Sequence, residues 1–168
     1  MKRLTRLLKH RLWDESDARR VLPAAVLRKF EHQVSASETL HSGEIRVCVE
    51  ASLPLSYLWR NAPARERAIA MFGKLRVWDT EHNNGVLIYL LLAERRIELV
   101  ADRALNRCVS AEEWQKLVDS MSTDFREQRF EQGLVNAIEG VSTLLIKHFP
   151  ITTYSRGINE LPNAPDLC

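Results

Sequence analysis

The chain has 168 residues, of which 45% are hydrophobic and 27% are charged. This length fits one domain with a sizeable core, and the composition excludes a chain that is disordered throughout. The formal net charge of +2 is nearly neutral, whereas general nucleic-acid binding usually needs a strong basic excess on one face. We therefore expect one folded domain without a nucleic-acid partner.

The three cysteines, Cys48, Cys108 and Cys168, have neither CxxC spacing nor companion histidines. This pattern predicts free thiols in a reducing compartment, not a disulfide framework or a zinc site. The longest apolar run, residues 86–93, is too short to span a bilayer. Residues 1–13 also lack the order of a secretory signal, because basic residues are interleaved with the leucines. We expect a cytoplasmic location.

Residues 1–22 form a basic amphipathic segment. Leucines recur there at helical spacing with basic residues between them: Leu4, Leu7, Leu8 and Leu12, with Lys2, Arg3, Arg6, Lys9 and Arg11. One interpretation is a weak contact with an anionic membrane surface or an acidic partner, which would place the protein at the periphery of the inner membrane. The other is an N-terminal helix that packs on the domain or frays.

Residues 23–150 carry the pattern of an α/β domain. Pro23 is suited to open a helix that continues to about residue 40. Residues 44–51 alternate apolar and polar side chains, which predicts a strand with one covered face. A second helix is predicted from Pro63 to about residue 75, preceded at 53–62 by a loop with room for one helical turn.

The second half of the domain begins with the dense apolar run at 86–93, which predicts a central strand covered on both faces. Residues 97–101 are predicted to return as its antiparallel partner. Ser110 and Glu113 have the spacing of a capping box at the start of a helix, and a last helix is predicted over 130–148. Residues 151–168 have the composition of an extended or disordered tail.

The order strand, helix, strand predicts a right-handed parallel crossover, and the hairpin then adds an antiparallel strand. Two strand starts and one strand end should therefore meet at one edge of the sheet. That edge gathers oxygen-bearing side chains suited to Ca²⁺ or Mg²⁺: Glu44, Asp79, Glu81, Asn83, Asn84 and Asp102. The alternative is a set of solvated loop residues, in which Asn84 and Gly85 only turn the chain through positive φ.

Other chemistry is weakly represented in the sequence. It contains no phosphate-binding loop, GxSxG, HExxH or EF-hand motif. The five histidines are scattered, and we interpret them as surface residues, so no catalytic residue is assigned. We interpret the four tryptophans as packing residues, because no basic stripe surrounds them.

Four spaced motifs resemble the TPM domain family, named for thylakoid, phosphatase and MOLO proteins. Residues 42–47 are similar to its first strand, and residues 79–87, which end in Asn-Asn-Gly-Val-Leu, to its most recognisable motif. Residues 97–100 resemble the next strand and residues 130–134 the start of the last helix. The resemblance covers roughly residues 23–150 and is to a bacterial member of cytoplasmic type.

The resemblance implies a three-layer α/β/α sandwich with a small mixed sheet. It also implies acidic groove residues that bind divalent cations in some relatives, acid phosphatase activity in a plant branch, and envelope or membrane association in others. The sequence departs from the family at two places. Asp102-Arg103-Ala104-Leu105-Asn106 replaces the usual Gly-x-Gly-Leu-Glu, and Trp78 replaces a usual glycine.

Two functions from different classes follow. In the first, a metal-dependent phosphoester hydrolase, Glu44, Asp79 and Asp102 hold a cation and Arg46 or Arg103 steadies an anionic oxygen. In the second, a non-catalytic interaction module, a cation held by Glu44, Asp79, Glu81, Asn84 and Asp102 orders the loops, and the partner is a membrane-associated protein. The lack of a clear nucleophile or general base favours the second, and the sequence leaves open whether the protein is an enzyme.

Overall fold

The computed structural model describes residues 2–151 and 159–167. The helices are α1 (Lys2–Arg11), α2 (Glu15–Val21), α3 (Ala24–Ser37), α4 (Leu55–Trp59), α5 (Ala64–Lys74), α6 (Arg103–Cys108), α7 (Ala111–Arg126) and α8 (Phe130–His148). The strands are β1 (Ile45–Glu50), β2 (Val86–Leu91), β3 (Arg96–Ala101) and β4 (Asp166–Leu167), and the 3₁₀ turn η1 (Leu92–Glu94) joins β2 to β3. The predicted α/β class is confirmed.

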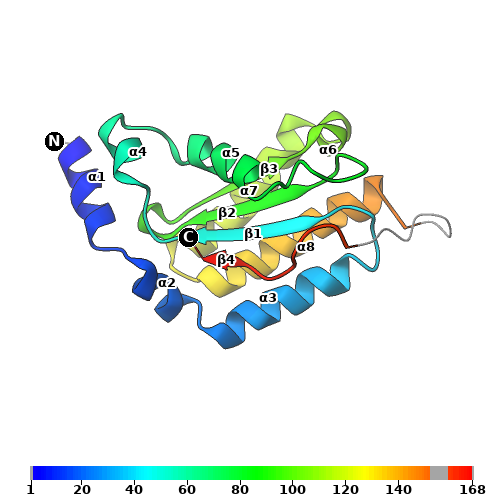
Figure 1. Ribbon diagram of the computed structural model, residues 1–168, viewed down its shortest axis with the longest axis horizontal. Coiled ribbons are helices and arrows are strands. Elements are labelled where there is room, and N and C mark those ends of the chain that lie inside the picture. The colour runs from blue at the N-terminus through cyan, green and yellow to red at the C-terminus, as the bar shows by residue number, and fades with distance from the viewer. Residues whose placement is uncertain (1, 152–158, 168) are drawn as a thin grey trace.

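The strands form one mixed sheet in the order β3-β2-β1-β4 (Figure 1). β1 and β2 are parallel, and β2 and β3 are antiparallel, as the sequence predicts. β4 pairs in parallel with the other side of β1, so that Cys48 lies opposite Asp166. The sequence does not predict β4, because two residues are too few to show a strand periodicity.

Helices cover both faces of the sheet, which gives the expected three layers. Alternate strand residues such as Ile45 and Ile88 pack against α2, α3, α7 and α8, which lie on one face. Their neighbours in sequence, such as Cys48 and Tyr89, pack against α4 and α5 on the other. All six residues of β1 are buried, so the prediction of a strand with one covered face is wrong.

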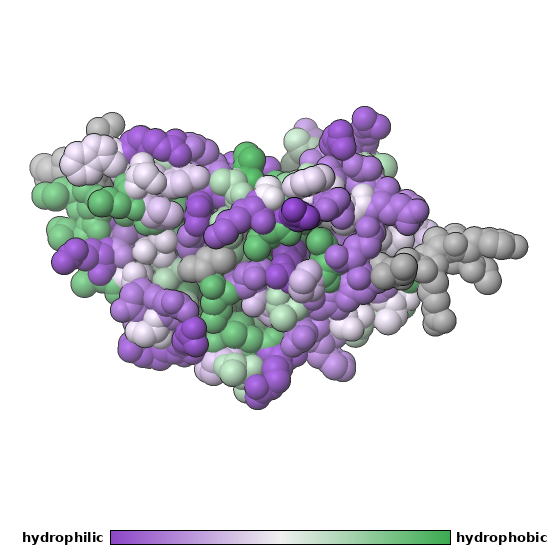
Figure 2. All heavy atoms as spheres, in the orientation of Figure 1, coloured by the Kyte–Doolittle hydropathy of each residue, from purple (hydrophilic) through white to green (hydrophobic). Residues whose placement is uncertain are grey.

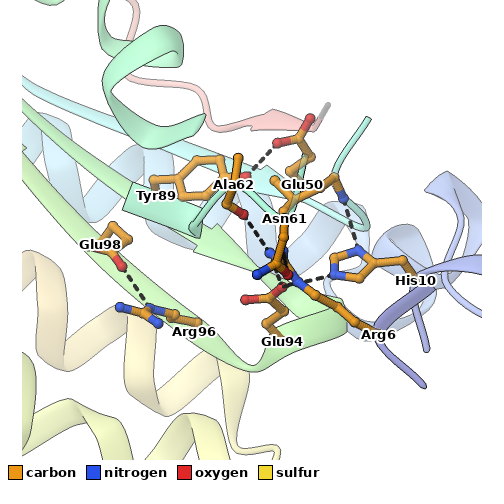
Figure 3. Close-up of polar contacts among 10 residues, drawn as sticks. Arg6, His10, Glu50, Asn61, Ala62, Tyr89, Glu94, Arg96 and Glu98 are labelled. Atoms are coloured by element: carbon orange, nitrogen blue, oxygen red, sulfur yellow. Dashed lines mark hydrogen bonds and ion pairs between the residues drawn. The ribbon is translucent and has the colours of Figure 1, made fainter. Parts of the chain in front are cut away.

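The two charged residues of β1 are buried because each has a charged partner from another segment: Asp166 for Arg46 and Arg67 for Glu50. Nε and Nη2 of Arg67 donate to the carboxylate of Glu50, at 2.9 and 2.6 Å. The hydroxyl of Tyr89 also donates to this carboxylate (Figure 3). Such a charge is tolerated in a core only when it is paired and hydrogen-bonded. An alternation of apolar and polar residues therefore did not mark a solvated face here.

The N-terminal helix α1 packs on the domain, in agreement with the second of the two interpretations of this segment. Arg6 Nε donates to Glu94 Oε1 at 2.7 Å, and the same oxygen lies 3.0 Å from Nε2 of His10 (Figure 3). The backbone N–H of Leu53 donates to Nδ1 of His10 at 3.0 Å, which makes Nε2 the protonated ring nitrogen. Arg6, Leu7 and His10 thus face the domain, and the interpretation of His10 as a surface residue is wrong.

The last helices follow the predicted signals closely. The side chain of Ser110 accepts from the N–H of Glu113, and the carboxylate of Glu113 accepts from the N–H of Ser110, which is the predicted capping box of α7. α8 has the predicted bounds of 130–148. No helix in the described part of the chain is long and apolar enough to cross a membrane.

Candidate functional site

The strand directions bring the three expected segments to one end of the sheet. Ile45, Val86 and Ala101 form one row across β1, β2 and β3. One residue further out, the N–H of Val86 donates to the carbonyl of Glu44 at 2.8 Å, and the N–H of Asp102 donates to the carbonyl of Gly85 at 2.9 Å. Glu44 and Asp102 therefore lie on either side of Gly85.

Gly85 is required there by space and not by a positive φ. A Cβ atom at this position would lie 2.1 Å from the carbonyl oxygen of Val77, so any side chain would push the loop away. The residue with positive φ is Asn83, at 52°. The interpretation that Asn84 and Gly85 turn the chain through positive φ is wrong by one residue.

The tail occupies the β1 side of this end. The carboxylate of Glu44 accepts from the N–H groups of Glu160 and Leu161, at 3.2 and 3.3 Å. Burial raises the pKa of Glu44, although these two hydrogen bonds oppose the shift. The guanidinium of Arg46 lies 2.6 Å from Asp166 and also donates to the carbonyl of Pro162. Both side chains are engaged by residues 160–166, which were expected to be extended or disordered.

Asp79 and Glu81 lie apart from the buried residues of the expected groove. The side chain of Asp79 is 55% exposed and lies 4.0 Å from Arg76. Glu81 is exposed, and its backbone N–H donates to the carboxylate of Glu160. Within the described residues, no three His, Cys, Asp or Glu side chains are placed to hold a metal ion together.

Asn84 and Asp102 each have one buried side-chain oxygen that accepts no hydrogen bond in the described structure. Nδ2 of Asn84 donates to the carbonyl of Ser42 at 3.1 Å, and Oδ1 of Asn84 has no partner in the described structure. Oδ1 of Asp102 accepts from the N–H of Arg103 at 2.6 Å as the N-cap of α6, whereas Oδ2 is buried without a described partner. These two oxygens are chemically suited to a hard cation.

Arg103 is mainly a surface residue. Its side chain is 78% exposed, and its guanidinium donates to Oδ1 of Asn83 at 2.8 Å. The N–H of Ala104 donates to the carbonyl of Asn83 at 3.0 Å. These bonds tie the start of α6 to the 79–85 loop, one through the side chain of Arg103 and the other through the backbone of Ala104.

Sequence reasoning missed a pair of titratable residues beside this end. Glu38, His41 and Glu44 line a cavity of about 270 Å³ together with Ser42, Ile151 and Asn159. Burial raises the pKa of Glu38 to about 7, and the charge of Glu44 adds to the shift. Burial lowers the pKa of His41 to about 4, so its ring is neutral near pH 7. The interpretation of the histidines as surface residues is wrong for His41, which lies in no recognisable motif.

The fold and the motifs of this end define the class of protein. The TPM domain pattern matches residues 16–144, and the chain belongs to this family. Among solved structures, the chain is similar to the BA42 protein of the psychrophilic bacterium Bizionia argentinensis, determined by NMR. The two share 29% sequence identity with a TM-score of 0.75, over 88% of this chain and 95% of that one. No curated protein matches the chain.

Proposed function

We propose that this TPM domain is a non-catalytic interaction module that works at a membrane surface. The observation that carries the proposal is an apolar patch at the end of the molecule formed by α1 and α4, where Figure 2 shows hydrophobic side chains gathered. The apolar patch consists of five side chains, each more than half exposed: Leu4, Leu8, Leu12, Leu55 and Trp59. Trp59 and the exposed Trp78 were expected to be packing residues, and that expectation is wrong for both.

The way α1 packs explains why this patch faces outward. Arg6, Leu7 and His10 contact the domain, so residues on the other side of the helix, at the spacing of Leu4, Leu8 and Leu12, face solvent. Lys9 and Arg11 are exposed on the same helix. Exposed leucines and a tryptophan beside basic residues are the composition of a helix that lies in an anionic membrane interface. A docked helix pays less ordering entropy on binding than a free one.

A divalent cation at the end of the sheet is the second part of the proposal. The unpaired oxygens of Asn84 and Asp102 support it, because a buried acceptor without a partner costs free energy unless a ligand or water binds it. One buried carboxylate oxygen and one amide oxygen suit Mg²⁺, which keeps several water ligands. Asp79 and Glu81 remain at the surface of the loop and would act through those waters.

The alternative, metal-dependent phosphoester hydrolysis, has less support. It needs Glu44 for the cation and Arg46 or Arg103 for an anionic oxygen. Glu44 and Arg46 are engaged by the tail, and the Arg103 guanidinium lies at the surface on Asn83.

Sedimentation with lipid vesicles tests the membrane part of the proposal. We expect the protein to bind vesicles that contain phosphatidylglycerol and to be released by high salt, which screens charge. Leu8→Glu should weaken binding about tenfold or more, because an apolar anchor is lost and a negative charge is added. Leu40→Glu is the control, since Leu40 is also exposed but lies near the other end of the sheet, before β1. Equal binding by the two variants contradicts the proposal.

A further inference from the structure

The free edge of the sheet is formed by β3, and its hydrogen-bonding groups are arranged to accept another strand. β3 pairs only with β2 among the described strands. The N–H of Asp102 bonds to the carbonyl of Gly85, which directly precedes β2. In this register every second residue of β3 bonds to β2, and the backbone N–H and C=O groups of the residues between them point away from β2. Ile97, Leu99 and Ala101 are therefore the outward-pointing residues.

Side chains bond to some of the outward-pointing backbone groups of β3 and leave the others without a hydrogen bond. Arg65 donates to the carbonyl of Leu99, and Nδ2 of Asn106 donates to the carbonyl of Ala101 at 2.6 Å. Within residues 2–151 and 159–167, no hydrogen bond reaches the N–H of Ile97, the carbonyl of Ile97 or the N–H of Leu99. Both residues are more than 90% buried, and backbone groups in such positions nearly always have a partner.

A cavity lies alongside this edge, large enough for a ligand. Its volume is about 650 Å³, and we call it the β3 groove. Four consecutive residues, Arg96 to Leu99, form one wall, α7 forms the opposite wall through Trp114 and Val118, and Arg65 of α5 closes one side. The indole N–H of Trp114 has no acceptor in the described structure. A cavity lined by consecutive residues of an edge strand suits an extended chain.

The charges around the β3 groove favour an acidic ligand. Arg65, Arg95, Arg96 and Arg126 line it together with Glu94, Glu98 and Asp119. Glu94 is paired with Arg6, and Glu98 with Arg96 at 2.7 Å. Among the described side chains, no carboxylate pairs with Arg95 or Arg126. A ligand with carboxylates would complement these two guanidiniums.

We propose that the β3 groove binds an extended acidic segment of a partner protein, which adds to β3 as a further strand. This inference rests on the proposed interaction-module function and names the surface and the chemistry of the partner. Backbone bonds would form with Ile97 and Leu99, while alternate side chains of the segment meet Trp114 and Val118 of α7 on one side and Arg65 of α5 on the other. Arg95 and Arg126 would meet acidic side chains where α7 ends. The segment thus alternates apolar and acidic residues.

Amide NMR spectra with a synthetic peptide test this inference. The probe is a short, capped peptide of alternating glutamate and valine. We expect it to shift the amide signals of Ile97 and Leu99 and the indole signal of Trp114, and to slow exchange of the two amides. A peptide with lysine in place of glutamate should bind at least about fivefold more weakly. A glutamate peptide with N-methylated backbone amides should lose binding, since it cannot donate to the carbonyl of Ile97.

Charge reversal at the groove gives the matched variants. Arg126→Glu should weaken peptide binding about fivefold or more, whereas Arg28→Glu, an equal charge change on α3, should not. Vesicle binding should be unchanged in Arg126→Glu, and peptide binding unchanged in Leu8→Glu, so the two proposals fail separately. No shift at millimolar peptide, shifts centred on another surface, or equal binding of the lysine peptide overturns the inference. Self-association of the free protein through β3 also overturns it, because a second copy would then be the ligand.

Discussion

The carboxylates of Glu38 and Glu44 line one cavity, and the charge of Glu44 reinforces the effect of burial on Glu38, whose pKa rises to about 7. Because this pKa exceeds the unfolded value of 4.5, the folded protein binds the proton more tightly than the unfolded chain does. Glu38 therefore favours folding most at low pH, and this contribution is lost as the pH rises from about 4.5 through 7. We predict that Glu38→Gln is more stable than the wild type at pH 8, by about 1 to 2 kcal/mol after solvent screening, and shows no such gain at pH 4.

Urea unfolding at the two pH values measures this difference. Glutamine keeps an oxygen that can accept from the N–H of Ile45, which bonds to Glu38 at 3.1 Å, so the comparison isolates the charge. An equal effect of the substitution at both pH values would show that folding does not raise the pKa of Glu38.

Gly85 and Gly73 form a contrasting pair for alanine substitution. A methyl group on Gly85 would collide with the backbone of Val77, whereas nothing lies within 4 Å of the corresponding position on Gly73 in α5. We predict that Gly85→Ala lowers the free energy of unfolding by about 2 kcal/mol or more. Gly73→Ala should raise it by about 0.5 to 1 kcal/mol, because alanine is the better helix former. Thermal unfolding of both variants checks the contrast, and equal effects would refute the packing argument.

Glu94 fixes α1 to the domain. Burial disfavours its charge, but the hydrogen bonds from His10 and Arg6 prevail and lower the pKa of Glu94 to about 2. Its stabilising contribution is therefore present above pH 4.5 and lost as the pH falls towards 2. Glu94→Gln should lower stability at pH 7 by about 1 to 2 kcal/mol.

Glu131→Gln is the control for Glu94→Gln, because it removes an exposed ion pair with Lys29 and should cost less than about 0.5 kcal/mol. Limited trypsin digestion reports on α1 directly, since release of the helix frees the chain at Arg6, whose side chain is bonded to Glu94 in the fold. Equal digestion of the two variants would mean that Glu94 does not hold α1.

The cation proposal predicts a change in thermal stability. A ligand bound only by the folded state must raise the melting temperature, and we expect a rise of about 2 to 5 °C at about 10 mM Mg²⁺ or Ca²⁺. Asp102→Asn should abolish most of the rise while it keeps the cap on α6. Glu112→Gln, an equal charge change at an exposed position of α7, should retain it. An unchanged rise in Asp102→Asn would place the cation elsewhere, and no rise in the wild type would remove this part of the proposed function.

Local signals predicted the longer helices α3, α5, α7 and α8 and the central strands, because a capping box and apolar periodicity act within a few residues. The capping box at Ser110 and the apolar run of β2 are examples. They also predicted which strand ends meet, since chain direction follows from the crossover rule. They did not predict the short helices α2 and α6. They could not predict the partners of Arg46 and Glu50, because Asp166 and Arg67 reach them through tertiary packing.

The candidate site was also predictable only where it depends on strand direction. Sequence reasoning placed Glu44, Gly85 and Asp102 at one end of the sheet, but not the tail that engages Glu44. No periodic pattern specifies where a proline-containing segment such as 159–167 will dock. The burial of His41 was hidden for the same reason, because its surroundings come from separate segments.

The position of β4 has a consequence for the order of folding. Arg46 and Pro162, which its docking brings together, are separated by 116 residues in the chain. Closing so long a loop costs entropy that only a few contacts offset, so β4 should join the sheet after β1, β2 and β3 have assembled. By the same reasoning it is the first strand to detach. Transient detachment of β4 should therefore expose the edge of β1 while the core stays intact. The rate of this exposure is the rate at which β4 leaves the sheet.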